Sequence, residues 1–153
     1  MPSRSAFQPR LASKFLSNLV LVEVTLGESP ALHIRVAGSA FEARLQCSMK
    51  GQDYLPYYPT EQRAGTMDVV ETMLARPCGR WQLNPLHYER GYAHHIEVTS
   101  FPLDAGPDAK PCMIFFTLPV PQPVLPRTTD GNVIAIHRSV AYKYIDIGAG
   151  VPS

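Results

Sequence analysis

Hydrophobic and polar residues alternate along three successive stretches in the first third of the chain. The stretches are 19–26, 31–36 and 41–47, and apolar residues take every second position in each. A period of two is the spacing of a strand that buries one face. Short glycine-containing turns separate the stretches, so we expect three consecutive strands in an antiparallel meander.

One amphipathic helix is predicted over about 66–76. Its apolar residues recur at spacings of one, three and four positions, which is the pattern of a helix with one buried stripe. They are Val69, Val70, Met73 and Leu74. Thr66 can cap the start of this helix, and Pro77 ends it because proline cannot continue the helical hydrogen bonds.

Further strands are predicted in the second half of the chain. Residues 80–83 form a short candidate, and 92–99 alternates clearly. The stretch 112–118 is apolar on both faces, which predicts a central strand covered on both sides, with the helix on one of them. Residues 132–147 fit one long strand, or two strands broken near Arg138 and Ser139, with Ile134, Ile136, Val140, Tyr142 and Tyr144 on one face.

The remaining segments are predicted to be irregular. Residues 51–65 form a loop rich in tyrosine and proline, 84–91 a connection, and 101–111 a surface loop. Residues 119–131 hold four prolines and form an extended connector, since proline gives a sheet no hydrogen-bond donor. Residues 148–153 form a tail.

The first 18 residues are basic. Arg4, Arg10 and Lys14 precede the first acidic residue, and apolar residues recur every four positions. This composition also matches an organelle targeting segment. We expect instead a retained, short amphipathic helix with Pro9 near its start.

Together these patterns predict a β-rich α+β fold in a single domain over 1–153. A mainly antiparallel sheet, or a two-layer sandwich, of about seven or eight strands would pack on the main helix, with the short N-terminal helix beside it. The chain of 153 residues is 45% hydrophobic, enough for a real core.

Charge and cysteine usage narrow the possible partners and cofactors. The formal net charge of +1 gives no global electrostatic case for binding nucleic acid or an anionic membrane. Three widely spaced cysteines without a CxxC pair argue against a disulfide framework and a zinc site. No apolar run reaches the roughly 18 residues of a membrane span. We therefore expect neither a metal nor a cofactor. We also expect the protein to be cytoplasmic or a component of a virion.

The leading functional hypothesis is protein contact. Tyr54, Tyr57 and Tyr58 lie among prolines and precede Arg63, and tyrosine and arginine carry much of the energy of protein interfaces. These four residues are the predicted partner-binding site of a non-enzymatic assembly subunit in a larger bacterial or viral complex. The N-terminal segment and the proline-rich connector 119–131 are predicted to act as extended arms that make further contacts. The partner would be another protein or a second copy. Alternatively, the tyrosines fold back to close the end of the sheet.

The first alternative is a small hydrolase or other enzyme with a histidine-containing site, possibly one that binds metal. His94, His137 and Asp146 could converge in such a site. No HExxH, GxSxG or phosphate-loop motif is present, so no catalytic residue is assigned. Cys78 follows the helix, at the end where the dipole disfavours a thiolate.

A third alternative is a single-stranded nucleic-acid binder. Tyr142, Lys143 and Tyr144 follow Arg138, and these are the residue types that stack on bases and track phosphates. This alternative is less favoured, because no glycine-aromatic run of the RNA-binding kind is present. The two tyrosines could equally pack on the core side of the sheet.

Overall fold

The computed structural model describes residues 1, 13–104, 106–121 and 131–152. Its strands are β1 Leu19–Thr25, β2 Ala31–Ala37, β3 Cys78–Tyr88, β4 Ala93–Leu103, β5 Cys112–Pro119, β6 Val133–Ile136 and β7 Ala141–Asp146. Its helices are the α-helices α1 Ser39–Leu45 and α2 Thr60–Ala75, and the 3-10 helices η2 Ser13–Asn18 and η3 Leu55–Tyr57.

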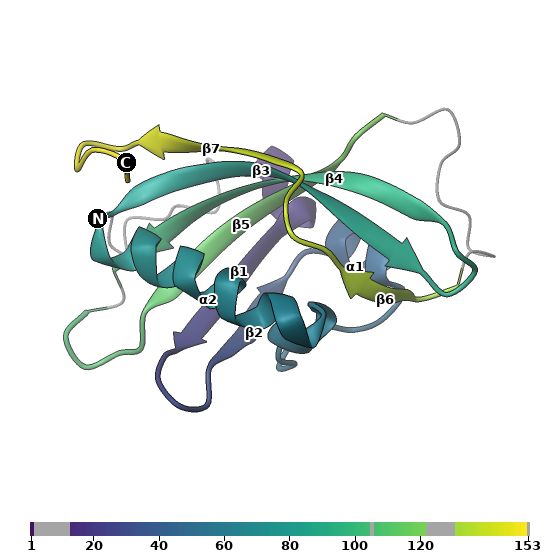
Figure 1. Ribbon diagram of the computed structural model, residues 1–153, viewed down its shortest axis with the longest axis horizontal. Coiled ribbons are helices and arrows are strands. Elements are labelled where there is room, and N and C mark those ends of the chain that lie inside the picture. The colour runs from purple at the N-terminus through teal and green to yellow at the C-terminus, as the bar shows by residue number, and fades with distance from the viewer. Residues whose placement is uncertain (2–12, 105, 122–130, 153) are drawn as a thin grey trace.

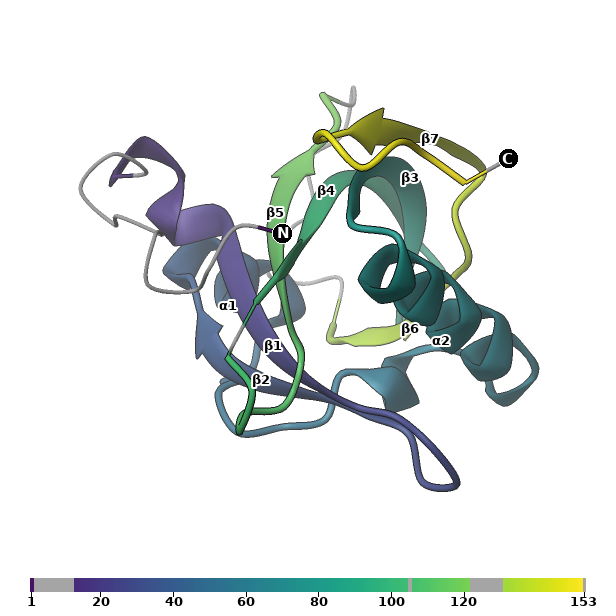
Figure 2. The same cartoon turned by 90° about the vertical axis from the view of Figure 1, so that its left-hand side faces the viewer.

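The seven strands form one antiparallel sheet in the order β2-β1-β5-β4-β3-β6. β7 also pairs with β3, on the same side as β6 but along the first half of the strand. The sheet curls into a half-barrel, and α2 lies across its concave face (Figures 1 and 2). The predicted antiparallel, β-rich α+β fold is confirmed, and a second stacked sheet is not seen among the described residues.

The main core fills the space between the concave face and α2. Alternate residues of β1 point into it, and so do three residues of α2, namely Met67, Val70 and Met73. A smaller apolar cluster lies on the convex face, where Leu19, Leu21 and Ile114 are buried. Both faces of β1 and β5 are therefore covered, as predicted for 112–118.

Residues 41–45 of the stretch 41–47 belong to the helix α1, so the prediction of a third meander strand is wrong. Phe41 and Leu45 are one helical turn apart, and both are buried in the main core. Ala43, which should share their face in a strand, is exposed. Positions four apart satisfy both a period of two and a helical period, so this short pattern could not separate the two structures.

The main helix was predicted, but it begins six residues early. Pro59 precedes α2, and residues 60–65 of the predicted loop form its first turns. Proline fits the start of a helix, where backbone N–H groups lack intrahelical partners. The prediction missed these turns because TEQRAG has no apolar stripe.

β3 and β4 both run further than predicted. β3 continues through Pro85 into the predicted connection, and β4 continues through Pro102 into the predicted loop. Pro85 pairs with His95 of β4, and on the other side its carbonyl accepts a hydrogen bond from the His137 backbone at 3.0 Å. The missing N–H of Pro85 thus falls at the break between β6 and β7, where no ladder needs it.

Of the two alternatives for 132–147, the structure has two strands, β6 and β7, broken near Arg138 and Ser139. Their predicted common face fails at Ile134, which is exposed while Ile136 is buried. The register of β6 on β3 shifts between His87 and Tyr88. Because of this shift, the side chains of Ile134 and Ile136 do not share one face of the sheet.

Two other predictions fall partly outside the described residues. These are the N-terminal helix, of which 2–12 are not described, and the proline connector, of which 122–130 are not described. The described end of the N-terminal segment is η2, whose Phe15 ring stands edge-on to Phe116 at 6.1 Å. No described helix combines the length and the apolar character needed to cross a membrane.

We expect opposite effects from two glycine-to-alanine substitutions. A methyl group at Gly38 would overlap the backbone carbonyls of Leu16 and Ser17, so Gly38→Ala should lower the free energy of unfolding by about 1–3 kcal/mol. In mid-helix, a methyl group at Gly65 would meet Arg138 at an ordinary 3.5 Å, so Gly65→Ala should raise stability by about 0.5–1 kcal/mol. Urea denaturation measures both, and a stable Gly38→Ala variant would contradict the close packing of η2.

Candidate ligand site

A row of polar residues runs along β3 on the concave face, next to the edge strands β6 and β7. β3 contributes Arg80, Gln82 and Asn84 at alternate positions, so their side chains point to the same side of the sheet. The antiparallel register places Ser100 of β4 beside Arg80, and Phe115 of β5 beside Ser100. The sheet therefore turns polar groups toward α2 at the place where a continuous apolar core would be expected.

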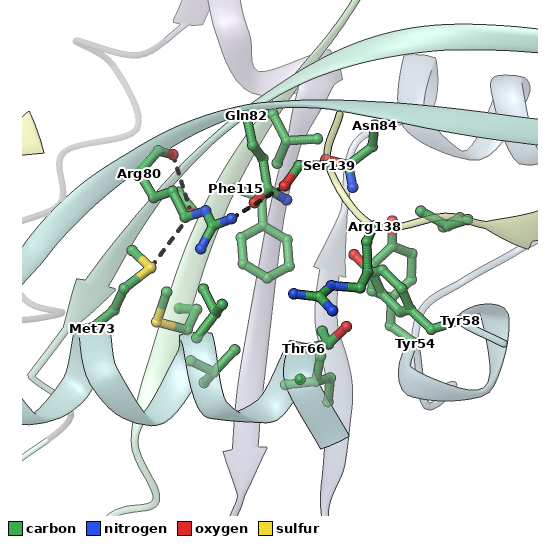
Figure 3. A pocket seen from close by; sticks show the side chains of 18 of the residues that line it. Tyr54, Tyr58, Thr66, Met73, Arg80, Gln82, Asn84, Phe115, Arg138 and Ser139 are labelled. Atoms are coloured by element: carbon green, nitrogen blue, oxygen red, sulfur yellow. Dashed lines mark hydrogen bonds between the residues drawn. The ribbon is translucent and has the colours of Figure 1, made fainter. Parts of the chain in front are cut away.

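A cavity of about 80 Å³ lies between this row and α2 (Figure 3). Val69, Val70 and Met73 of α2 form its apolar wall. Tyr54 and Tyr58 close one end. The β3 side of the cavity is thus a polar wall, whereas α2 and the other strands contribute mainly apolar side chains, among them Val98, Met113 and Ile136.

Arg80 is a buried cation on the polar wall, with only 6% of its surface exposed. Its Nη2 donates to Ser139 Oγ at 3.1 Å, and its Nη1 donates to the Tyr144 hydroxyl at 3.4 Å. The guanidinium carbon lies 4.1 Å from the centre of the Tyr142 ring, a cation–π contact. Arg80 Nε is buried and donates to no group of the described protein.

Asn84 carries a second unpaired atom on the same wall, and its side chain is only 1% exposed. Its Nδ2 donates to the His137 carbonyl oxygen at 2.8 Å, which fixes the orientation of the amide because a carbonyl oxygen can only accept. Asn84 Oδ1 is then left without a described donor. A buried polar atom with no partner costs about 1–3 kcal/mol, so such atoms need an explanation.

Arg138 brings a second positive charge to the cavity, from the connection between β6 and β7. Its backbone N–H donates to Gln62 Oε1 at 2.8 Å, and its guanidinium lies against the helix at Gly65. Figure 3 shows Arg80 and Arg138 extending toward the same space above α2. No acidic residue is among the described residues that line the cavity. The ion pairs within the described residues are those of Glu23 with Arg35 and Lys110, away from this site.

The tyrosines at the end of the cavity are held in the neutral form. Burial raises the pKa of Tyr58 to about 12, although the nearby Arg80 guanidinium acts in the opposite direction. Burial also raises the pKa of Tyr54 well above its usual value, and Tyr58 adds to that effect. Both hydroxyls therefore keep their protons at neutral pH.

The structure separates the four predicted partner-binding residues into two pairs. Tyr54 and Tyr58 are buried and line the cavity, which matches the alternative in which the loop folds back onto the sheet. Tyr57 is half-buried. Arg63 donates to the carbonyls of Tyr58 and Pro56, at 2.9 and 3.1 Å, and so holds the loop onto α2. Their role in binding a partner stays a prediction.

The histidine site considered from the sequence does not assemble. His94 is buried with its ring edge-on to Tyr88, at 5.4 Å between centroids. His137 instead lies 4.3 Å from the ring of His87, and Asp146 accepts hydrogen bonds from backbone N–H groups of the C-terminal tail. In the part of the chain that is described, no three His, Cys, Asp or Glu side chains gather where they could hold a metal ion.

The aromatic segment considered for nucleic acid divides between the two faces of β7. Tyr142 and Tyr144 lie on the same side as Arg80, and Tyr142 remains 57% exposed. Lys143 points to the other face, where its ammonium lies 5.7 Å from the ring of Trp81.

The polar row was missed from the sequence, although it has a sequence pattern. The segment 80–84 alternates Arg, Trp, Gln, Leu and Asn. The usual assumption turns the apolar residues of such a strand inward, whereas here Arg80, Gln82 and Asn84 face the core side. The alternation could predict a strand, but only the register could show which face met the helix.

A scan against protein-family models and a search of curated proteins found no match to this chain.

The raised tyrosine pKa values predict a loss of stability in alkali. Above pH 10 the unfolded chain releases the proton of Tyr58, whereas the folded protein keeps it until about pH 12. The stabilising contribution is therefore complete below pH 10 and is lost as pH rises toward 12. Tyr58→Phe should flatten this decline, as measured by urea denaturation at stepped pH. Tyr92→Phe, on an exposed turn, is the control, and equal slopes in both variants would contradict the assignment.

Proposed function

We propose that the protein binds a small organic molecule in the cavity between α2 and the concave face. The observation that carries this proposal is the cluster of buried polar residues in the cavity lining, in which Arg80 Nε and Asn84 Oδ1 have no described partner. A ligand with hydrogen-bonding groups would add polar partners to this cluster. Concave, mostly apolar sites with a few fixed polar groups are the usual form of small-molecule sites.

A purely structural role for the polar row is the less economical explanation. Apolar side chains at these positions would fill the space without leaving buried polar atoms unpaired, and polar atoms in a core are normally satisfied. The row instead lowers the stability of the empty protein, which is a common property of binding sites.

The lining favours binding over catalysis. Hydroxyl groups are present at Thr66, Ser100 and Ser139, but the described lining offers no His, Asp, Glu, Lys or Cys to act as a general base or nucleophile. The cavity also limits the size of the ligand. At about 80 Å³ it is smaller than the roughly 150 Å³ cavity that accepts benzene in another protein.

A second proposed function is assembly with another protein or a second copy, as an assembly subunit would require. β7 pairs only with β3 among the described strands, so its other edge has no strand partner there. Val140, just before β7, is 63% exposed, and Tyr142 and Ile147 are also exposed. An open edge with exposed apolar residues is a site where a further strand can add.

Ligand binding can be tested with a fragment screen followed by protein NMR. Wild type should show saturable shifts at residues lining the cavity. Val69→Phe should abolish them by filling the cavity, since Val69 lines its helix wall. Ala64→Phe is the matched control, because Ala64 lies on the exposed side of the same helix. A screen in which no compound gives saturable shifts at the cavity would overturn the proposal.

Assembly can be tested by size-exclusion chromatography with light scattering and by pull-down. Association through the β7 edge predicts a mass above that of one chain, or a captured partner, and its loss in Val140→Lys. Tyr57→Ala should weaken the contact without unfolding the protein if the predicted loop takes part. A monodisperse monomer that captures no partner would contradict assembly.

A further inference from the structure

We infer that the ligand of this cavity is a short organic acid whose carboxylate pairs with Arg80. This inference rests on the proposed small-molecule site and names the chemical class that fits it. Three parts of the site support it: the charge of the lining, the hydrogen-bonding geometry of Arg80, and the apolar side chains beside the polar wall.

The first part is charge. Arg80 and Arg138 both line the cavity, and no described lining residue carries a negative charge. The Arg80 side chain is a planar, delocalised cation. Its described partners, the hydroxyls of Ser139 and Tyr144 and the ring of Tyr142, are all neutral. A buried cation without a counterion is strongly unfavourable, and a bound anion would remove that cost.

The second part is geometry. The guanidinium of Arg80 has five N–H donors in a planar fork, and Ser139 and Tyr144 engage only one donor from each terminal nitrogen. Each terminal nitrogen therefore keeps a second N–H, on a side chain that neighbouring residues already hold in place. A planar fork of this kind matches the two oxygens of a carboxylate.

The third part is the shape of the rest of the site. Asn84 Oδ1 only accepts hydrogen bonds, so it repels a carboxylate and directs that group toward Arg80. Val70 and Met73 of α2 and Phe115 of β5 offer an apolar surface for a carbon chain, and Figure 3 shows Met73 and Phe115 beside the Arg80 side chain. The small volume restricts that chain to a few carbon atoms.

Arg138 supplies attraction rather than the main contact. Unlike Arg80, it is exposed, and solvent screens an exposed charge. We expect it to raise the local concentration of anions and to contribute less affinity than Arg80.

The experiment compares acids with their own primary amides by calorimetry on wild type. The probes are straight-chain and hydroxylated acids of roughly two to six carbons, with inorganic phosphate as a separate arm. An acid and its amide have nearly the same shape and differ in charge. Acids should bind about tenfold to a hundredfold more tightly than the matched amides, because the amide loses a charge-assisted pair. Affinity should also vary with chain length, and phosphate should bind more weakly because it has no apolar body.

Substitutions at three arginines identify the side chain that contacts the carboxylate of the acid. Arg80→Met should weaken binding of the acids about tenfold to a hundredfold and remove the preference for acid over amide. Arg138→Gln should weaken binding by less, about twofold to fivefold. Arg90→Gln removes the same charge from an exposed turn and should leave affinity unchanged. If Arg80→Met does not fold, the acid–amide comparison on wild type and the Arg138→Gln variant still decide.

The outcomes separate this inference from the proposed site. If amides bind as tightly as acids and Val69→Phe abolishes both, the site exists but its ligand is not an acid. If phosphate binds as tightly as the acids, with no effect of chain length, the organic-acid class is wrong. If no probe binds at the cavity and the fragment screen also fails, the proposed function itself is wrong.

Discussion

A guanidinium held away from water against the concave face is the constraint on which the rest of this structure depends. Arg80 is positioned by β3, contacted by the two tyrosines of β7, and hydrogen-bonded to Ser139. A helix then covers the same face. The curved sheet, the edge strand β7 and the helix α2 together shield the Arg80 guanidinium from water. A charge shielded from water interacts much more strongly with an opposite charge than a solvated charge does.

The interruption at Pro85 connects this constraint to the topology. If β6 and β7 formed one continuous strand, the residues between them would be paired with β3 and would not turn toward the cavity. The neighbour of β3 divides into β6 and β7 beside Pro85, which offers no donor, and the connection between them carries Arg138 and Ser139 to the lining. His137, in the same connection, accepts the hydrogen bond that orients Asn84. One residue type at one position thus places polar groups from distant parts of the sequence side by side.

Much of the fold could be predicted from the sequence, but the site could not. The strands at 19–26, 31–36 and 112–118 were predictable because their burial follows a clear pattern, whereas 41–47 fits two periods at once. Arg80, Gln82 and Asn84 break the usual assumption that polar residues face solvent, and functional sites are where such rules fail. The composition of the tyrosine-rich loop predicted a contact with a partner. In the structure α2 begins at Thr60, and Tyr54 and Tyr58 line the cavity.

The divided ladder beside β3 has a consequence for dynamics. Hydrogen bonds along a continuous strand pair break cooperatively, but β6 and β7 are separate units with their own registers on β3. The ladder of β7 on β3 shares no residue with the ladder of β6, so loss of the first leaves the second in place. Such a partial opening would carry Tyr142 and Tyr144 away from the guanidinium.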